Sequence, residues 1–228
     1  RLLPALAAIM LVAALPAAAE KKVAEWFGGE DGAPYGGVKR AIEQAADAAL
    51  AARVPEELLV ERLAEGAAKG VPPDALQRAM EEGAGTLAEI AVNLDRRVPR
   101  LDDGIRTEAL RLASIAVRGG IDTDTIDAAV AWTVDGGRDL GRTMSALVAV
   151  AALHRGLALD ADRGLALAKA FALSKEKTSR FGAFVSLLSG ARARGLSAGT
   201  VTDAALSALA EGRTFLALQR ELDRRSSR

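Results

Sequence analysis

A glycine followed directly by a branched apolar residue recurs along the chain at places where helical patterns end. Glycine adopts the left-handed conformation that ends a helix at little cost, and the next apolar residue packs back on the last turn. The motif therefore predicts helices connected by short turns. It occurs at Lys69-Gly70-Val71, Gly119-Gly120-Ile121, Arg155-Gly156-Leu157 and Arg194-Gly195-Leu196, and at Arg53-Val54-Pro55 with Arg in the glycine position.

The residues beside the motif favour the same interpretation. Lys69 precedes the first glycine, and Pro72, Pro73 and Asp74 follow Val71. A cation in the last turn faces the negative end of the helix dipole, while Pro and Asp suit the first turn of the next helix. We expect one helix to end near Lys69 and another to begin near Pro73.

The spacing of the motif leaves two interpretations open. Its apolar residues lie 17, 50, 36 and 39 positions apart, and the last two intervals fit a two-helix repeat. The signature residues of tetratricopeptide and ankyrin units are absent. The chain therefore contains either degenerate repeats or a common way of ending unrelated helices.

Composition favours close-packed helices over sheet. Half of the 228 residues are apolar but only eight are aromatic, which suits one domain with a sizeable core or two small ones.

The absence of Cys excludes disulfides, thiolate metal sites and a Cys nucleophile. The formal charge is zero, yet the residues from Lys169 onward carry a net charge of +6, an asymmetry that would help to steer a partner.

Eleven segments show helical spacing of apolar residues, and none shows sustained alternation. We therefore predict an all-α fold, an irregular helical-hairpin array that is either α-solenoid-like or an orthogonal bundle. The helix at 139–154 is apolar nearly all round its second half and is expected to be buried. The predicted helices are 38–52, 55–69, 73–82, 86–96, 105–118, 124–134, 139–154, 161–174, 177–194, 199–211 and 214–225.

Three parts are expected along the chain. Residues 1–19 are apolar after Arg1 and end in three alanines, which predicts a cleaved signal peptide, with an uncleaved membrane anchor as the alternative. Residues 20–37 form an arm rich in glycine and aromatic residues, and no helix is expected in its part from Trp26 to Gly37. Residues 38–228 form the helical domain, with a possible internal boundary at 98–104.

The aromatic residues of the arm have two possible roles. Trp26 and Tyr35 either dock a partner or lie over one end of the helical core, and we favour the second. The candidate partner-binding residues are Trp26, Tyr35, Trp132 and Arg155.

Two short patterns suggest ligand sites, but simpler interpretations exist. Gly136 to Thr143 has phosphate-loop spacing with Arg in place of Lys, although that site needs a preceding strand and 127–135 is predicted to be helical. The aspartates near Asp122 and Asp160 resemble the start of calcium loops without the full ligand set. We interpret them as helix caps.

Three further residues have side chains that occur in catalytic or metal sites. Ser174 and Lys177 match a Ser-x-x-Lys pattern that lacks its companion motifs. His154 is the only histidine, and no carboxylate lies three or four residues from it. We therefore assign no catalytic, metal-ligating or cofactor-binding residue, and we expect no cofactor.

These features predict an exported, non-catalytic binding or scaffolding module of the bacterial cell envelope, periplasmic or secreted, with a protein partner. No nucleic acid is expected, and membrane contact is expected only if the N-terminal segment is uncleaved. Two alternatives remain: a carboxylate-dependent cell-envelope hydrolase or lytic enzyme, and a membrane-anchored structural protein.

Overall fold

The computed structural model describes residues 22–212 and 215–226, and in these ranges the chain is helical with no strand. The all-α prediction is confirmed. The expected signal segment at 1–19 lies outside the described residues. The α-helices are α1 (Val23–Phe27), α2 (Lys39–Ala51), α3 (Glu56–Ala68), α4 (Pro73–Arg97), α5 (Asp103–Arg118), α6 (Thr123–Asp135), α7 (Leu140–Leu157), α8 (Ala161–Leu173), α9 (Phe181–Ala193), α10 (Ala198–Ala210) and α11 (Phe215–Ser226), and the 3₁₀ helices are η1 (Ala33–Val38) and η2 (Thr178–Arg180).

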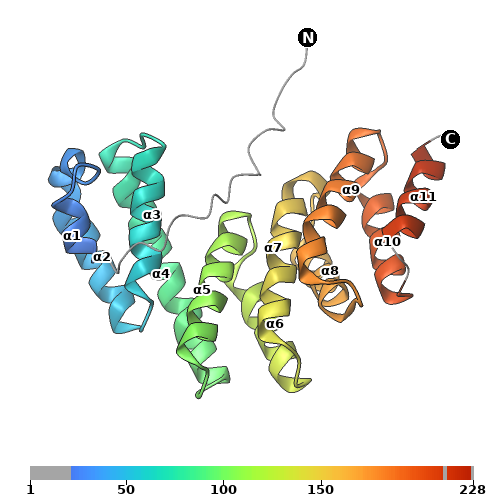
Figure 1. The fold of residues 1–228 in the computed structure, drawn as a ribbon, viewed down its shortest axis with the longest axis horizontal. Coiled ribbons are helices and arrows are strands. Elements are labelled where there is room, and N and C mark those ends of the chain that lie inside the picture. Colours follow the sequence, from blue (N-terminus) through green and yellow to red (C-terminus); the bar gives the residue numbers. More distant parts are fainter. Residues whose placement is uncertain (1–21, 213–214, 227–228) are drawn as a thin grey trace, which may run out of the picture.

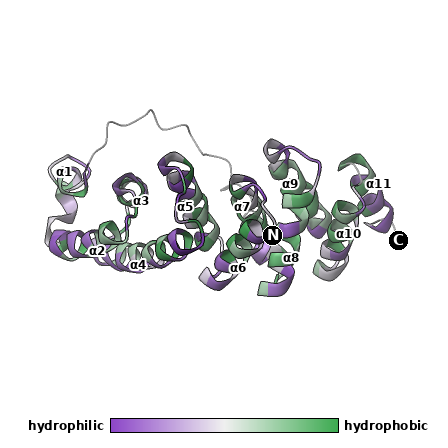
Figure 2. Cartoon of the chain, turned by 90° about the horizontal axis from the view of Figure 1, so that it is seen from below, coloured by the Kyte–Doolittle hydropathy of each residue, from purple (hydrophilic) through white to green (hydrophobic). Residues whose placement is uncertain are grey.

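The helices form two rows that follow the chain along the long axis of the molecule (Figures 1 and 2). One row holds the odd-numbered helices from α1 to α11, and the other holds the even-numbered helices from α2 to α10. Within a row, α5 packs on α7 and α7 on α9, while α4 packs on α2 and α6. Across the described ranges, no helix has both the length and the apolar character that a membrane crossing requires.

The predicted helix endings occur at four of the five motif sites. Arg53, Gly70, Gly120 and Gly195 have φ angles of 62, 63, 104 and 96°, in the left-handed region. In each case the next residue, which is apolar, donates its amide hydrogen bond to the carbonyl five residues earlier, as Val71 does to Gly66. At these sites the motif sets where one helix stops and the next begins.

The prediction for Gly156 is wrong. Helix α7 continues through Gly156 and Leu157, and the left-handed residue is Ala158, with φ of 46°. The amide of Leu159 then bonds to the carbonyl of His154, so the same type of turn closes two residues later. Leu157 and Leu159 are both buried, and this burial offsets the cost of a left-handed alanine.

The predicted break between 82 and 86 is also wrong, because α4 is one helix of 25 residues. Gly83 and Gly85 lie in its interior, where glycine normally weakens a helix. However, α2 packs along α4, and Met80, Ala84 and Leu87 are buried. Tertiary packing therefore overrides the low helix propensity of the two glycines.

The expectation that residues 26–37 contain no helix is wrong, since α1 ends at Phe27 and the 3₁₀ helix η1 begins at Ala33. Trp26 and Tyr35 are each 5% exposed, and their ring centroids lie 5.6 Å apart. The Tyr35 hydroxyl donates a 2.9 Å hydrogen bond to the carbonyl of Val71. These contacts confirm that the two rings cover the N-terminal end of the helical core.

The left-handed turn can be tested by comparing Gly195→Ala with Gly156→Ala. A Cβ atom added at either site meets no other atom within 4 Å, so only backbone conformation differs. Gly195→Ala is expected to destabilise the fold by about 1–2 kcal/mol because of its positive φ. Gly156→Ala is expected to be neutral or stabilising by up to about 0.5 kcal/mol, because that residue is helical. Urea titration measures both, and equal effects would contradict the turn assignment.

Candidate functional site

Helices α3 and α5 are neighbours in one row, and a groove of about 180 Å³ lies between them over α4. Its floor includes Leu87 and Ile90 of α4, which are each 3% exposed. The groove therefore offers apolar surface below and polar or charged side chains around it. The residues that line it are Arg62 of α3, Glu82, Gly83, Thr86, Leu87 and Ile90 of α4, and Ser114, Val117 and Arg118 of α5.

Ion pairs connect α3 to α5 beside this groove. Arg111 lies 3.1 Å from Glu57 and 3.0 Å from Glu61, and Arg118 pairs with Glu65. The hydrogen bond from Lys69 and the charge of Arg118 hold the pKa of the Glu65 carboxyl below its usual range. The two helices are thus connected through solvent-accessible charges rather than through close apolar packing.

Arg62 is the unusual residue of the groove. Its side chain is half-buried, and a Cβ atom added at Gly83 would lie 2.4 Å from its Cζ atom. The guanidinium therefore lies against the backbone of α4 at Gly83, and a side chain at that position would displace it. Burial, followed by the nearby charge of Arg118, lowers the pKa of Arg62, and Glu65 and Glu82 partly oppose this shift.

Arg62 differs from the other arginines that are at least partly buried. Within the described ranges, no hydrogen bond or ion pair joins its guanidinium to another group. Its nitrogen atoms are not fully buried, so solvent reaches the donors that no protein group accepts. The other partly or fully buried arginines are all bonded: Arg97 to Asp127, Arg106 to Asp95, Arg111 to Glu61, Arg142 to the carbonyl of Ala172 and Arg192 to the carbonyl of Gly156.

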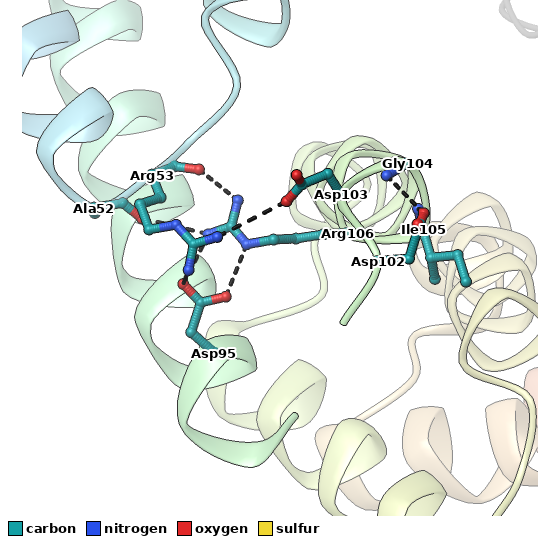
Figure 3. A network of polar contacts seen from close by, with 8 residues as sticks. All are labelled: Ala52, Arg53, Asp95, Asp102, Asp103, Gly104, Ile105 and Arg106. Atoms are coloured by element: carbon teal, nitrogen blue, oxygen red, sulfur yellow. Dashed lines mark hydrogen bonds and ion pairs between the residues drawn. The ribbon is translucent and has the colours of Figure 1, made fainter. Parts of the chain in front are cut away.

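A second arginine fixes the N-terminal end of α5 (Figure 3). Arg106 is 4% exposed and donates hydrogen bonds of 2.7 and 3.0 Å to the carboxylate of Asp95 on α4. It also donates to the carbonyl of Arg53 in the turn between α2 and α3. The hydrogen bond from Arg106 lowers the pKa of Asp95. Arg106 therefore connects α5 both to α4 and to the start of α3.

The residues predicted to bind a partner lie elsewhere and are not brought together. Trp26 and Tyr35 are buried at the N-terminal end, and Arg155 is exposed on α7. Trp132 on α6 lies between two cations, with its ring centroid 4.0 Å from Cζ of Arg138 and 5.7 Å from Nζ of Lys169. Partner binding by these four residues stays a prediction.

The short motifs have structural roles. Asp122 and Asp160 cap α6 and α8 by accepting hydrogen bonds of 2.6 and 2.7 Å, which confirms the capping interpretation. Gly136 and Gly137 follow helix α6 rather than a strand, so the phosphate-loop context is missing there. The Ser174 hydroxyl donates to the carbonyl of Phe171 at the end of α8.

The described residues do not form a metal site around His154. Its ring lies close to Gly120, where an added Cβ atom would be 2.8 Å from Cδ2, and its Nδ1 atom is buried without a hydrogen-bond partner. Among the residues that the structure describes, no group of three His, Cys, Asp or Glu side chains is placed to hold a metal ion.

Sequence reasoning did not identify Arg62, Gly83 or Arg118. The one available signal was Gly83, a glycine inside a helical pattern, which can mark a close approach by a neighbouring group. It was interpreted as part of a break instead. No protein-family model, curated protein or solved structure matches the chain.

Replacing Arg62 or Arg106 by Met should show which of the two arginines stabilises the fold. Arg62→Met removes a charge with no direct partner, so the free energy of unfolding is expected to stay the same or to rise. Arg106→Met leaves Asp95 and a carbonyl without their donor and is expected to destabilise the fold by about 3–5 kcal/mol. Urea titration of both variants is the measurement. A larger loss for Arg62→Met than for Arg106→Met would overturn this assignment.

Proposed function

We propose that the protein is a non-catalytic binding module that holds a segment of a protein partner in the groove between α3 and α5. The observation that carries the proposal is Arg62, a half-buried arginine with no direct partner among the described residues, beside an apolar floor. A preformed groove with one free charged donor group suits recognition, because its polar group is not used by the fold itself.

The arrangement that presents the groove is proposed to be an α-solenoid. The caps of α6, α8 and α10 are Asp122, Asp160 and Ser197, which follow one another at intervals of 38 and 37 residues. This period matches a two-helix repeat, and successive helices of each row pack on their neighbours except for α3 and α5. Stacked hairpins of this type form extended surfaces for binding other proteins.

The chemistry of the groove supports binding over hydrolysis. Glu82 is its single lining carboxylate, whereas acid–base catalysis by carboxyl groups needs two with different pKa values. Elsewhere in the described chain, Glu65, Asp95 and Asp127 have lowered pKa values because they bond to Lys or Arg. A general acid needs a raised pKa instead.

The size of the groove supports a peptide segment as the ligand. Its volume of about 180 Å³ is below the roughly 300–1,000 Å³ of typical small-molecule sites. A single side chain of a partner fits such a space, while the remainder of the partner would lie across the helices around it. We therefore propose a protein partner rather than a large soluble metabolite.

Export to the bacterial envelope is also part of the proposal. Its support is the apolar segment 1–19 with its three alanines before Glu20, which lies outside the described residues. A periplasmic or secreted location follows if that segment is cleaved, and a membrane anchor is the alternative.

Blocking the groove tests the binding function. Peptides are first selected from a random display library on the wild-type protein, and their affinities are then measured by titration calorimetry. Ser114→Phe, which places a ring in the groove, is expected to weaken their binding by about tenfold or more, since the ring occupies the site. Ser186→Phe, on an exposed face of α9, is the matched control and should leave affinity unchanged. Equal binding to all three proteins would contradict the proposed site.

A further inference from the structure

We infer that the groove recognises a carboxylate, supplied by an acidic side chain of the partner segment, and that Arg62 is the residue that binds it. This inference rests on the proposed function and names the chemistry of its ligand. Arg62 lines the groove, lies against the backbone at Gly83, and has no hydrogen-bond acceptor among the described residues.

The geometry of a guanidinium favours this ligand. Its N–H donors form a planar fork that matches the two oxygens of a carboxylate. In the described chain, Arg106 makes this paired contact with Asp95, and Arg97 makes it with Asp127. Arg62 has the same side chain in a half-buried position but lacks the carboxylate, which a ligand can provide.

The charged residues around Arg62 favour a ligand that carries a single negative charge. Arg118 lies near enough to lower the pKa of Arg62, but it is itself paired with Glu65, which also bonds to Lys69. Glu82 lies at the same groove and opposes a second negative charge. Glu82 and Glu65 repel any incoming anion, and this repulsion is smaller for a singly charged carboxylate than for a doubly charged phosphate.

The floor of the groove suggests what carries the carboxylate. Leu87 and Ile90 lie beneath the charged rim, and Val117 borders them from α5. Apolar surface of this kind packs against methylene groups and excludes water, which strengthens the ion pair above it. A glutamate side chain, with its two methylene groups and terminal carboxylate, satisfies both parts of the groove.

The test compares two peptides that differ in one group, acetyl-Ala-Leu-Glu-Leu-Ala-amide and its Gln counterpart, with inorganic phosphate as a third probe. Nitrogen–proton NMR spectra of the protein report the Nε–Hε signal of Arg62 and the amide signals of Gly83 and Leu87. The Glu peptide is expected to shift these signals and to bind about tenfold more tightly than the Gln peptide, because a charge-assisted hydrogen bond is stronger than a neutral one.

Two arginine variants distinguish a loss of carboxylate recognition from a loss of folding. Arg62→Gln should remove the preference for the Glu peptide while the circular dichroism spectrum stays unchanged. Arg78→Gln is the matched control, because Arg78 is an exposed residue of α4 outside the groove lining. That variant should keep the preference of the wild type.

The possible failures are distinguishable. Equal binding of both peptides at the groove overturns carboxylate recognition and leaves the proposed peptide-binding function standing. Phosphate shifting the Arg62 signal when neither peptide does so also overturns the inference, because the site would then serve a free anion. No change at the groove with any of the three probes contradicts both the inference and the proposed function.

Discussion

The buried contact of Arg106 with Asp95 determines how the N-terminal half of the molecule is arranged. Because Arg106 also donates to the carbonyl of Arg53, one side chain connects α5, α4 and the turn before α3. A polar contact of this kind fixes helix ends without requiring close apolar packing along their lengths. The groove lies farther along α5, where Ser114, Val117 and Arg118 line it.

The other contacts between α3 and α5 are exposed ion pairs, which stabilise the fold less than a buried contact does. Arg111 and Arg118 are 34% and 41% exposed, and their glutamate partners on α3 are 41–46% exposed. Ion pairs at such positions contribute little individually and are screened by salt. Arg62 lies beneath them without a direct partner, so the fold uses charge to hold the groove walls and leaves one charge available inside.

The sequence allowed prediction of the features that depend on local chemistry. The left-handed turns at Gly70, Gly120 and Gly195 and the caps at Asp122 and Asp160 follow from residue type and position. The turn near Gly156 and the continuity of α4 could not be predicted, because burial of neighbouring residues decided both. The groove was missed for a related reason: Arg62 resembles an ordinary surface arginine until α3, α4 and α5 are placed in space.

A double-mutant cycle between Arg106 and Asp95 tests most directly whether their contact organises the fold. Unfolding free energies are measured for the wild type, Arg106→Met, Asp95→Asn and the double variant, with Arg118 and Glu65 as a parallel cycle. The account predicts a coupling energy of about 1.5–3 kcal/mol for Arg106 with Asp95, and at most about 1 kcal/mol for the exposed pair. Equal, small coupling in the two cycles would contradict it.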